Sequence, residues 1–384
     1  MSTGAEEMAA LRPRRSGMVK WIAVVAIVIV VVVITAGALA GWFSSPPITI
    51  VGAGASFPEP LIAKWAGVYV TLTGVRVNYA SLGSGVGIAQ ITAKTVDFGA
   101  SDAPLNATER SRAPGLLHIP ETIGAVTAAY NLPGIPSGLN LTGQVLADIF
   151  LGTITNWNDT AIATLNPTVT LPNAAISVVH RADGSGTTFI WTSYLHLAST
   201  TWPSSIVGKN PSWPTGTGKP QNAGVAGYVA ATPNTIGYVE LAYTVLNSMT
   251  VAKIRNPAGN FVLPTLASTS DAAASASPTL PAPDEDWSAV SILNAPGPTS
   301  YPVSSLTYLL VYKELNVFGS SMTQVKAKAL VDFLWWVVHD VVDGKPAGQS
   351  YAAALVYVPL PASIQTLDEG GLGSITFNGQ TLHT

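Results

Sequence analysis

The stretch Arg181-Ala-Asp-Gly-Ser-Gly-Thr-Thr-Phe189 decides how this chain is interpreted. It follows a strand-like apolar run at 175–179 and leads into the segment 188–195, which has apolar residues at helical spacing and neither glycine nor proline. A glycine-rich turn between a strand and a helix is typical of an anion site, because free backbone N–H groups and the positive end of the helix dipole face the ligand. Arginine adds a planar fork that matches a tetrahedral oxyanion.

The same stretch also fits a simple helix N-cap. Ser185 or Thr187 would then cap the helix, and Arg181 would pair with Asp183. Taken alone, the stretch supports both interpretations equally, so other parts of the chain must decide between them.

Three further glycine-rich loops favour the anion site. GAGASFP (52–58) follows a short apolar run, SLGSGVG (81–87) precedes another helical segment, and VDFGASDAP (96–104) ends a short strand with an acid. Together with 181–187 they supply small hydroxyl groups, glycines, one aspartate and one arginine. This combination predicts a ring of mostly neutral donors around a buried anion.

As an ordered set, these loops resemble the substrate-binding protein of the high-affinity phosphate ABC transporter. The resemblance runs from residue 48 to residue 357. It is strongest at GAGASFP (52–58), TVDFGASDAPL (95–105), RADGSGT (181–187) and IGYVE (236–240).

Strand-like runs alternate with helical segments from residue 48 onward, which predicts an α/β fold. The resemblance implies more: a two-lobed, type II periplasmic-binding-protein-like fold with two hinge-crossing strands. Lobe one would comprise 48–123 plus 302–384, and lobe two would comprise 124–301. Phosphate would lie in the cleft between the lobes, which close around it by a hinge motion.

The resemblance also implies the ligand-binding residues. It places phosphate against Ser56, Phe57, Ser84, Asp102, Arg181, Ser185, Gly186 and Thr187. Asp183 is expected to hold the guanidinium of Arg181 in place. The alternatives are that Ser56 only caps the next helix, and that Asp102 is a turn residue before Pro104.

Asp102 has a chemical consequence for selectivity. An ionised carboxylate only accepts hydrogen bonds, so in an anion site it requires a proton on the ligand. Phosphate keeps a proton near neutral pH and sulfate does not. We therefore expect Asp102 to disfavour sulfate by leaving an unpaired, repelling carboxylate against it.

The chain departs from the family pattern at three positions. Ser56 stands where the family usually has threonine, which keeps the hydroxyl. After the serine that matches Ser84 the family usually has Ser-Gly-Gly, whereas this chain has Gly85-Val86-Gly87, and Val86 is expected to restrict the backbone of a loop there. His180 replaces a residue that is commonly basic and lowers the local positive charge.

The N-terminal region predicts export. The uncharged run at 21–43 has 23 residues, enough for a helix to cross a bilayer, and Arg12, Arg14, Arg15 and Lys20 precede it. The positive-inside rule then places 1–20 in the cytoplasm and the rest outside, in a single-pass membrane protein. The alternative is a secretory signal cleaved near Ala38-Leu-Ala40, which would release the protein.

Composition excludes several classes of protein. Only 10% of residues are charged and the net charge is −3, which argues against nucleic-acid binding. The absence of cysteine and the scattering of five histidines predict no metal site, and we expect no cofactor. Neither a Gly-x-Ser-x-Gly elbow nor a P-loop is present, so no enzymatic activity is expected.

These observations predict a monomeric protein that binds inorganic phosphate outside the membrane and delivers it to an ABC permease. Two alternatives remain open from sequence: a receptor for another oxyanion, such as sulfate or molybdate, and a surface sensor or adhesion protein that retains the fold.

Overall fold

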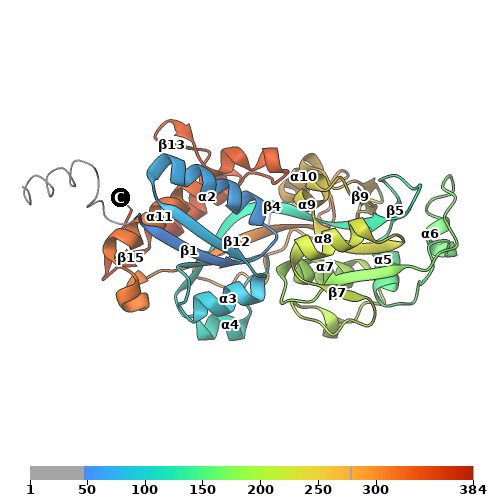
Figure 1. Ribbon diagram of the computed structural model, residues 1–384, viewed down its shortest axis with the longest axis horizontal. Helices are drawn as coiled ribbons and strands as arrows, with labels where there is room; N and C mark the ends of the chain where they lie inside the picture. Colours follow the sequence, from blue (N-terminus) through green and yellow to red (C-terminus); the bar gives the residue numbers. More distant parts are fainter. Residues whose placement is uncertain (1–46, 277–278, 384) are drawn as a thin grey trace, which may run out of the picture. The chain divides into compact units, whose positions relative to one another are not determined.

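The computed structural model describes residues 47–276 and 279–383 (Figure 1). Its largest sheet has nine strands, eight of them in the order β2-β1-β3-β12-β4-β8-β6-β7, and β9 pairs with β4 on the edge opposite β8. The strands of this sheet are β1 (Thr49–Gly54), β2 (Arg76–Ser81), β3 (Phe98–Ser101), β4 (Leu116–Asn131), β6 (Ser177–Arg181), β7 (Thr217–Lys219), β8 (Thr235–Glu240), β9 (Thr250–Val251) and β12 (Ser304–Tyr312).

Strand β4 belongs to both halves of this sheet. Its residues Leu116 to Ala125 pair antiparallel with β12, and its residues Val126 to Asn131 pair antiparallel with β8. On one side, β1, β2 and β3 run parallel to one another; on the other, β6, β7 and β8 do the same. The sheet therefore consists of two parallel sets joined by the long strands β4 and β12.

Helices flank the strands, and shorter pairings close the loops. The α-helices are α2 (Glu59–Thr73), α3 (Ser84–Thr92), α4 (Ala107–Arg112), α5 (Gly143–Phe150), α6 (Thr160–Ala163), α7 (Gly186–Ala198), α8 (Gln221–Ala231), α9 (Leu241–Leu246), α10 (Leu266–Ala276), α11 (Gln324–Val338) and α12 (Ala362–Gly373). The 3-10 helices are Ser204–Ile206, Leu315–Ser321, Gly348–Tyr351 and Ala353–Leu355. The short strands are β5 (Asn140–Leu141), β10 (Lys253–Arg255), β11 (Phe261–Val262), β13 (Val341–Val342), β14 (Lys345–Pro346), β15 (Thr376–Phe377) and β16 (Gln380–Thr381).

Local sequence explains where α2, the helix after the loop 52–58, begins and ends. Pro58 precedes α2 with its φ already fixed, Glu59 complements the helix dipole, and Gly74 ends the helix in a left-handed conformation. One face of α2 is buried, and Tyr69 on it meets Phe333 of α11 edge-on at 5.1 Å between ring centroids. Residues 55–58, at the end of the loop 52–58, therefore lead into a rigid helix.

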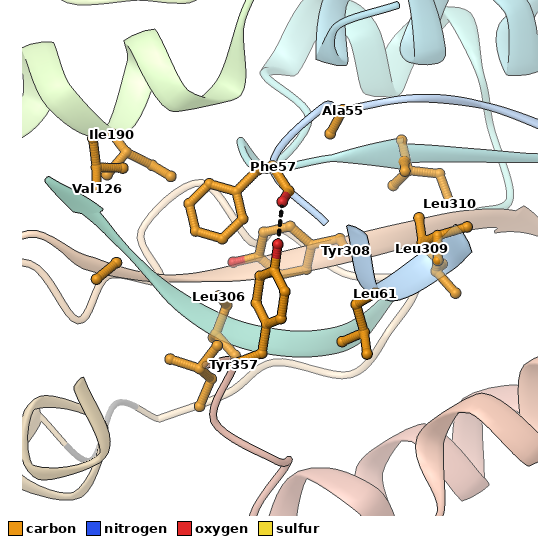
Figure 2. Packing of buried hydrophobic residues seen from close by; sticks show 14 of the residues in the cluster. Ala55, Phe57, Leu61, Val126, Ile190, Leu306, Tyr308, Leu309, Leu310 and Tyr357 are labelled. Carbon is orange, nitrogen blue, oxygen red and sulfur yellow. Dashed lines mark hydrogen bonds between the residues drawn. The ribbon is translucent and has the colours of Figure 1, made fainter. Parts of the chain in front are cut away.

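The hydrophobic core extends directly beneath the loop 52–58 (Figure 2). Phe57 is fully buried and packs toward Tyr357, with Leu306 of β12 close by. In the other half, Trp191 of α7 stacks on Tyr238 of β8 at 5.5 Å. Each half thus places a packed aromatic layer directly behind its loops.

Most expected elements are present, with differences at their ends. The apolar run at 125–130 has the composition of a short strand but is part of the much longer β4, and the helical pattern that starts at 323 ends at Val338. Val86 lies inside α3, where its amide donates to the Gly83 carbonyl, so the expectation that it restricts a loop backbone is wrong. Trp335 of α11 is half-buried, packs against the core and stacks on His383.

The expected membrane segment at 21–43 lies outside the described residues. Within 47–276 and 279–383, no helix has the length and apolar character needed to cross a bilayer.

Substitution of Gly124 in β4 tests how tightly the core supports the loop 52–58. A Cβ there would lie 2.4 Å from the ring of Phe57, which has no room to move because it is fully buried. We expect Gly124→Ala to lower the free energy of unfolding by about 1–3 kcal/mol in urea titrations. Gly67→Ala is the control: its Cβ meets nothing within 4 Å on α2, so it should raise stability by up to about 1 kcal/mol. A Gly124→Ala protein as stable as wild type would contradict this packing.

Candidate functional site

Loops from both halves of the large sheet meet at one place. Ser56, Ser84 and Asp102 follow the carboxyl ends of the parallel strands β1, β2 and β3. The segment 181–187 follows β6, and Asn222 lies in the first turn of α8, just beyond β7. Ligand sites in open α/β sheets form at the carboxyl ends of parallel strands, so this arrangement brings two such ends together.

The N-terminus of α7 begins this site. Ser185 is its N-cap, and its hydroxyl accepts a hydrogen bond from the Thr188 amide at 3.0 Å. The capping interpretation is therefore correct for Ser185. The amide of Gly186 donates to Ser84 Oγ at 3.1 Å, which joins the two halves. A Cβ on Gly186 would come within 2.6 Å of Ser84 Oγ and of Asp102 Cβ, so only glycine permits this approach.

Arg181 is buried and held on both sides. Its Nε donates to Asp183 Oδ1 at 2.8 Å, a second guanidinium nitrogen pairs with the other oxygen of Asp183, and Nη1 donates to Thr187 Oγ1 at 3.3 Å. Burial raises the pKa of Asp183, but the hydrogen bonds and charge of Arg181, together with the amide of Gln221, outweigh it and hold that pKa below its usual value. The arginine therefore has a fixed orientation and a fixed counter-ion.

Asp102 is a buried carboxyl group, and the described residues form a hydrogen bond with only one of its two oxygens. Its Oδ2 accepts from Thr187 Oγ1 at 3.2 Å, whereas its Oδ1 has no hydrogen-bond partner among the described residues. Burial raises the pKa of Asp102 from 3.8 to about 7, against the lowering effects of the Arg181 charge and the Thr187 hydrogen bonds. The local turn is made instead by Ser101, whose Oγ accepts from the Ala103 amide, so Asp102 is not merely a turn residue.

The hydroxyl of Thr187 connects these groups. It donates its single hydrogen to Asp102 and accepts from Arg181 and from Asn222 Nδ2, the last at 3.1 Å. One donor and two acceptor positions are the whole capacity of a hydroxyl group. Thr187 therefore fixes the relative positions of the carboxylate, the guanidinium and the amide.

The hydroxyls of Ser56 and Ser84 are oriented as donors. Ser56 Oγ accepts from the backbone and side-chain nitrogens of Asn222, at 3.0 and 3.1 Å. Ser84 Oγ accepts from the amides of Asp102 and Gly186, at 3.2 and 3.1 Å. Because both acceptor positions of each oxygen are occupied, each hydroxyl hydrogen is left to donate to another group. No side-chain cap is made at the start of α2, so the alternative role of Ser56 as its cap is wrong.

Phe57 can offer a ligand only its backbone. Its ring is fully buried in the core, away from the polar groups of the site. The backbone amides of Ser56 and Phe57 donate to no acceptor within the described part of the chain. Buried N–H groups are nearly always paired, so these two amides indicate a place where a ligand accepts hydrogen bonds.

His180 lies beside the site without entering it. Its ring stacks on Trp213 at 4.8 Å, its Nδ1 is 2.9 Å from the Arg181 carbonyl oxygen, and burial lowers its pKa. Across residues 47–276 and 279–383, no cluster of three His, Cys, Asp or Glu side chains could hold a metal ion.

Comparison with known proteins shows the family of this chain. A family model described as a PBP superfamily domain matches residues 43–341. The chain is 46% identical over 323 residues to the phosphate-binding protein PstS of Pasteurella multocida, covering 82% of this chain and 87% of that protein. It is 38% identical over 326 residues to the PstS of Methanocaldococcus jannaschii, covering 79% and 83%. The chain belongs to the PstS family.

A solved structure of the PBP type agrees with the fold. The high-affinity periplasmic phosphate-binding protein PfluDING, bound with phosphate at pH 8.5, has a TM-score of 0.67 and 21% sequence identity to this chain. The match covers 84% of this chain and 93% of that one. The α/β PBP-like fold of this PstS-family member is therefore as expected from its sequence.

Sequence reasoning missed two residues of the site. Asn222 is fully buried, donates to Ser56 and Thr187, and accepts from the Glu240 amide at 3.0 Å. Gln221 has φ +59° and donates its amide to Asp183 at 2.9 Å. The one available signal was the position of Pro220, which starts a helix just after a short strand as Pro58 does.

The raised pKa of Asp102 predicts how stability depends on pH without ligand. Between pH 3.8 and about 7 the folded chain keeps a proton that the unfolded chain loses, so this carboxyl makes the free energy of unfolding fall as pH rises. In Asp102→Asn this contribution to the fall is absent. The free energies of unfolding of the two proteins should therefore change relative to each other by at most about 4 kcal/mol between pH 3.8 and about 7. Urea unfolding at a series of pH values measures the difference between the two proteins.

The exposed carboxylate of Asp271 on α10 provides the matched control. Asp271→Asn makes the same exchange of a carboxyl for an amide at an exposed position, so its curve is the reference for Asp102→Asn. If the Asp102→Asn curve runs parallel to the wild-type curve between pH 4 and 7, Asp102 ionises alike in the folded and unfolded chains.

Proposed function

We propose that this chain binds inorganic phosphate outside the cytoplasmic membrane and delivers it to an ABC permease for import. Membership of the PstS family supports this assignment, since the relatives named above are phosphate-binding proteins. We assign no chemical reaction to the site: phosphate is cargo here, and the partners are phosphate and the permease.

The balance of donors and acceptors at the site is the observation that carries the proposal. The hydroxyls of Ser56 and Ser84 and the backbone amides of Ser56 and Phe57 are available as donors. Opposite them, Asp102 Oδ1 is a buried acceptor without a protein partner among the described residues. Several donors and one acceptor suit a tetrahedral oxyanion that still carries a proton, which is the state of phosphate near neutral pH.

The fixed charges of the site also suit an anion that is selected by hydrogen bonds. Arg181 places one guanidinium beside the site, but Asp183 already compensates most of its charge. Ser185, Gly186 and Thr187 add the N-terminus of α7, where the helix dipole favours negative charge. Above the pKa of Asp102, where its carboxylate only accepts hydrogen bonds, sulfate would gain the same donors but would face Asp102 without a proton to share.

We also propose that the chain divides into two lobes, because the loops of the site come from two parallel sets of strands joined by β4 and β12. Lobe one comprises 48–123 plus 302–384, and lobe two comprises 124–301, with β4 and β12 crossing between them. The contacts of Gly186 with Ser84, and of Lys209 with Glu109 at 2.7 Å, then link one lobe to the other. A hinge in the crossing strands allows the lobes to close on phosphate.

The site of action follows from the N-terminal sequence. We propose that the uncharged run at 21–43 either anchors the chain in the membrane or directs its secretion, with the phosphate-binding body outside. A protein held near the membrane is then positioned to reach a permease.

Calorimetric titration of the purified protein with phosphate, arsenate and sulfate tests the assignment. Wild type should bind phosphate and arsenate, and ignore sulfate. Asp102→Asn should bind phosphate about 10- to 100-fold more weakly, because it loses a hydrogen bond to a charged group, and should gain affinity for sulfate. Asp271→Asn should behave as wild type. A wild-type protein that binds no phosphate would refute the proposed function.

Small-angle X-ray scattering tests the hinge. If the lobes close on the ligand, the radius of gyration should decrease when phosphate is added at concentrations that saturate the calorimetric signal. Sulfate at the same ionic strength serves as the control and should leave the profile unchanged. An unchanged profile at phosphate saturation would mean that binding requires no lobe movement.

A further inference from the structure

The loop at 55–57 has an unusual set of backbone contacts. Three consecutive carbonyl oxygens, those of Ala55, Ser56 and Phe57, each accept a hydrogen bond from the hydroxyl of a different tyrosine. The donor–acceptor distances are 2.6 Å for Tyr79, 2.7 Å for Tyr243 and 2.7 Å for Tyr357. Figure 2 shows the last of these bonds, from Tyr357 to the carbonyl of Phe57.

These bonds fix the direction of two backbone amides. A peptide unit is planar, so holding the carbonyl of one residue also sets the N–H of the next. Tyr79 on Ala55 therefore orients the amide of Ser56, and Tyr243 on Ser56 orients the amide of Phe57. These are the two buried amides that donate to no acceptor in the described part of the chain. Phe57 precedes proline, which has no amide hydrogen, so Tyr357 holds the Phe57–Pro58 peptide without orienting a further donor.

The three tyrosines come from separate parts of the chain and are themselves fixed. Tyr79 lies in β2 and stacks on Phe98 at 6.1 Å. Tyr243 lies in α9, and Tyr357 lies beyond the last 3-10 helix; both are buried. A loop rich in glycine and small residues has little stiffness of its own, so its conformation must be imposed by such contacts.

Two of the hydroxyls also approach carboxyl groups. Tyr243 Oη is 3.2 Å from Glu59 Oε2, and Tyr357 Oη is 3.1 Å from Glu240 Oε2. In both cases the loop carbonyl is the nearer acceptor, and a phenol has only one hydrogen to donate. The carbonyl contacts are therefore the ones that the hydroxyl hydrogens make.

We infer that Tyr79, Tyr243 and Tyr357 are positioning residues that preorganise the backbone amides of Ser56 and Phe57 for the anion. This inference rests on the proposed phosphate-binding function. Preorganised donors spare the ligand the cost of ordering the loop, so loss of a tyrosine hydroxyl weakens binding without removing any group that touches phosphate.

The test replaces each tyrosine by phenylalanine, which removes the hydroxyl and leaves the ring. We expect Tyr79→Phe, Tyr243→Phe and Tyr357→Phe each to weaken phosphate binding about 3- to 10-fold in calorimetric titrations, the usual range for one neutral hydrogen bond. Tyr130→Phe is the matched control. Tyr130 is a buried tyrosine whose hydroxyl donates to the Pro136 carbonyl, outside the site, so its loss should leave the affinity unchanged.

A labelling experiment separates positioning from general loss of stability. Ser56-Phe57 is the only serine–phenylalanine pair in the chain, so carbonyl-¹³C serine combined with ¹⁵N phenylalanine selects one amide signal, that of Phe57. Before phosphate is added, this signal should move in Tyr243→Phe and stay in place in Tyr130→Phe. In wild type it should shift on phosphate addition, and in Tyr243→Phe the shift should be smaller at saturation.

The outcomes separate this inference from the proposed function. If wild type binds phosphate but the tyrosine variants bind it equally well, with the Phe57 signal unmoved, the positioning role is wrong and the phosphate site stands. If wild type binds no phosphate, the proposed function fails first. Should one variant not fold, the other two still decide, because the three tyrosines act on separate carbonyls.

Discussion

The long strand β4 is the constraint on which the rest of the structure depends. All of its residues except the last are buried, and it pairs with β12 along one part and with β8 along the other. Because its register is fixed on both sides, the parallel set β1, β2, β3 and the parallel set β6, β7, β8 cannot shift independently in this conformation. The loops at the carboxyl ends of both sets are consequently brought to one place, and the hydroxyl of Thr187, after β6, can reach Asp102, after β3 in the other half of the sheet.

Within the site, saturation of hydrogen bonds determines what kind of ligand fits. Every acceptor position of the Thr187, Ser56 and Ser84 hydroxyls is occupied by an N–H group of the protein. The serines are thereby left as donors, whereas Asp102 is left with one free acceptor among the described residues. We expect a site with this polarity to discriminate by proton count, which net charge alone does not achieve.

Sequence reasoning found the loops because their signals are local. Glycine next to small hydroxyl residues, after an apolar run and before a helical one, specifies a strand–turn–helix unit, and RADGSGT folds as that pattern predicts. It missed Asn222 and the three tyrosines because their roles depend on distant partners: Tyr357 is 300 residues from the carbonyl that it contacts. The expectation for Val86 was wrong since helix α3 begins two residues before it, which a pattern of glycines does not reveal. The segment at 21–43 lies outside the described residues, so its prediction stands untested.

The few charges at the site have a consequence for binding strength. Asp183 neutralises Arg181, and burial raises the pKa of Asp102 to about 7 and that of the nearby carboxyl of Glu121 to about 8. Glu240 is likewise buried, and burial raises its pKa. With so little net positive charge to attract an anion, affinity must come from dipoles that are already aimed, because reorienting them on binding would consume the small gain that each neutral hydrogen bond provides. Rigid support for the loop at 55–57 is therefore a requirement of a nearly neutral site, and the hydroxyls of Tyr79, Tyr243 and Tyr357 are placed to provide it.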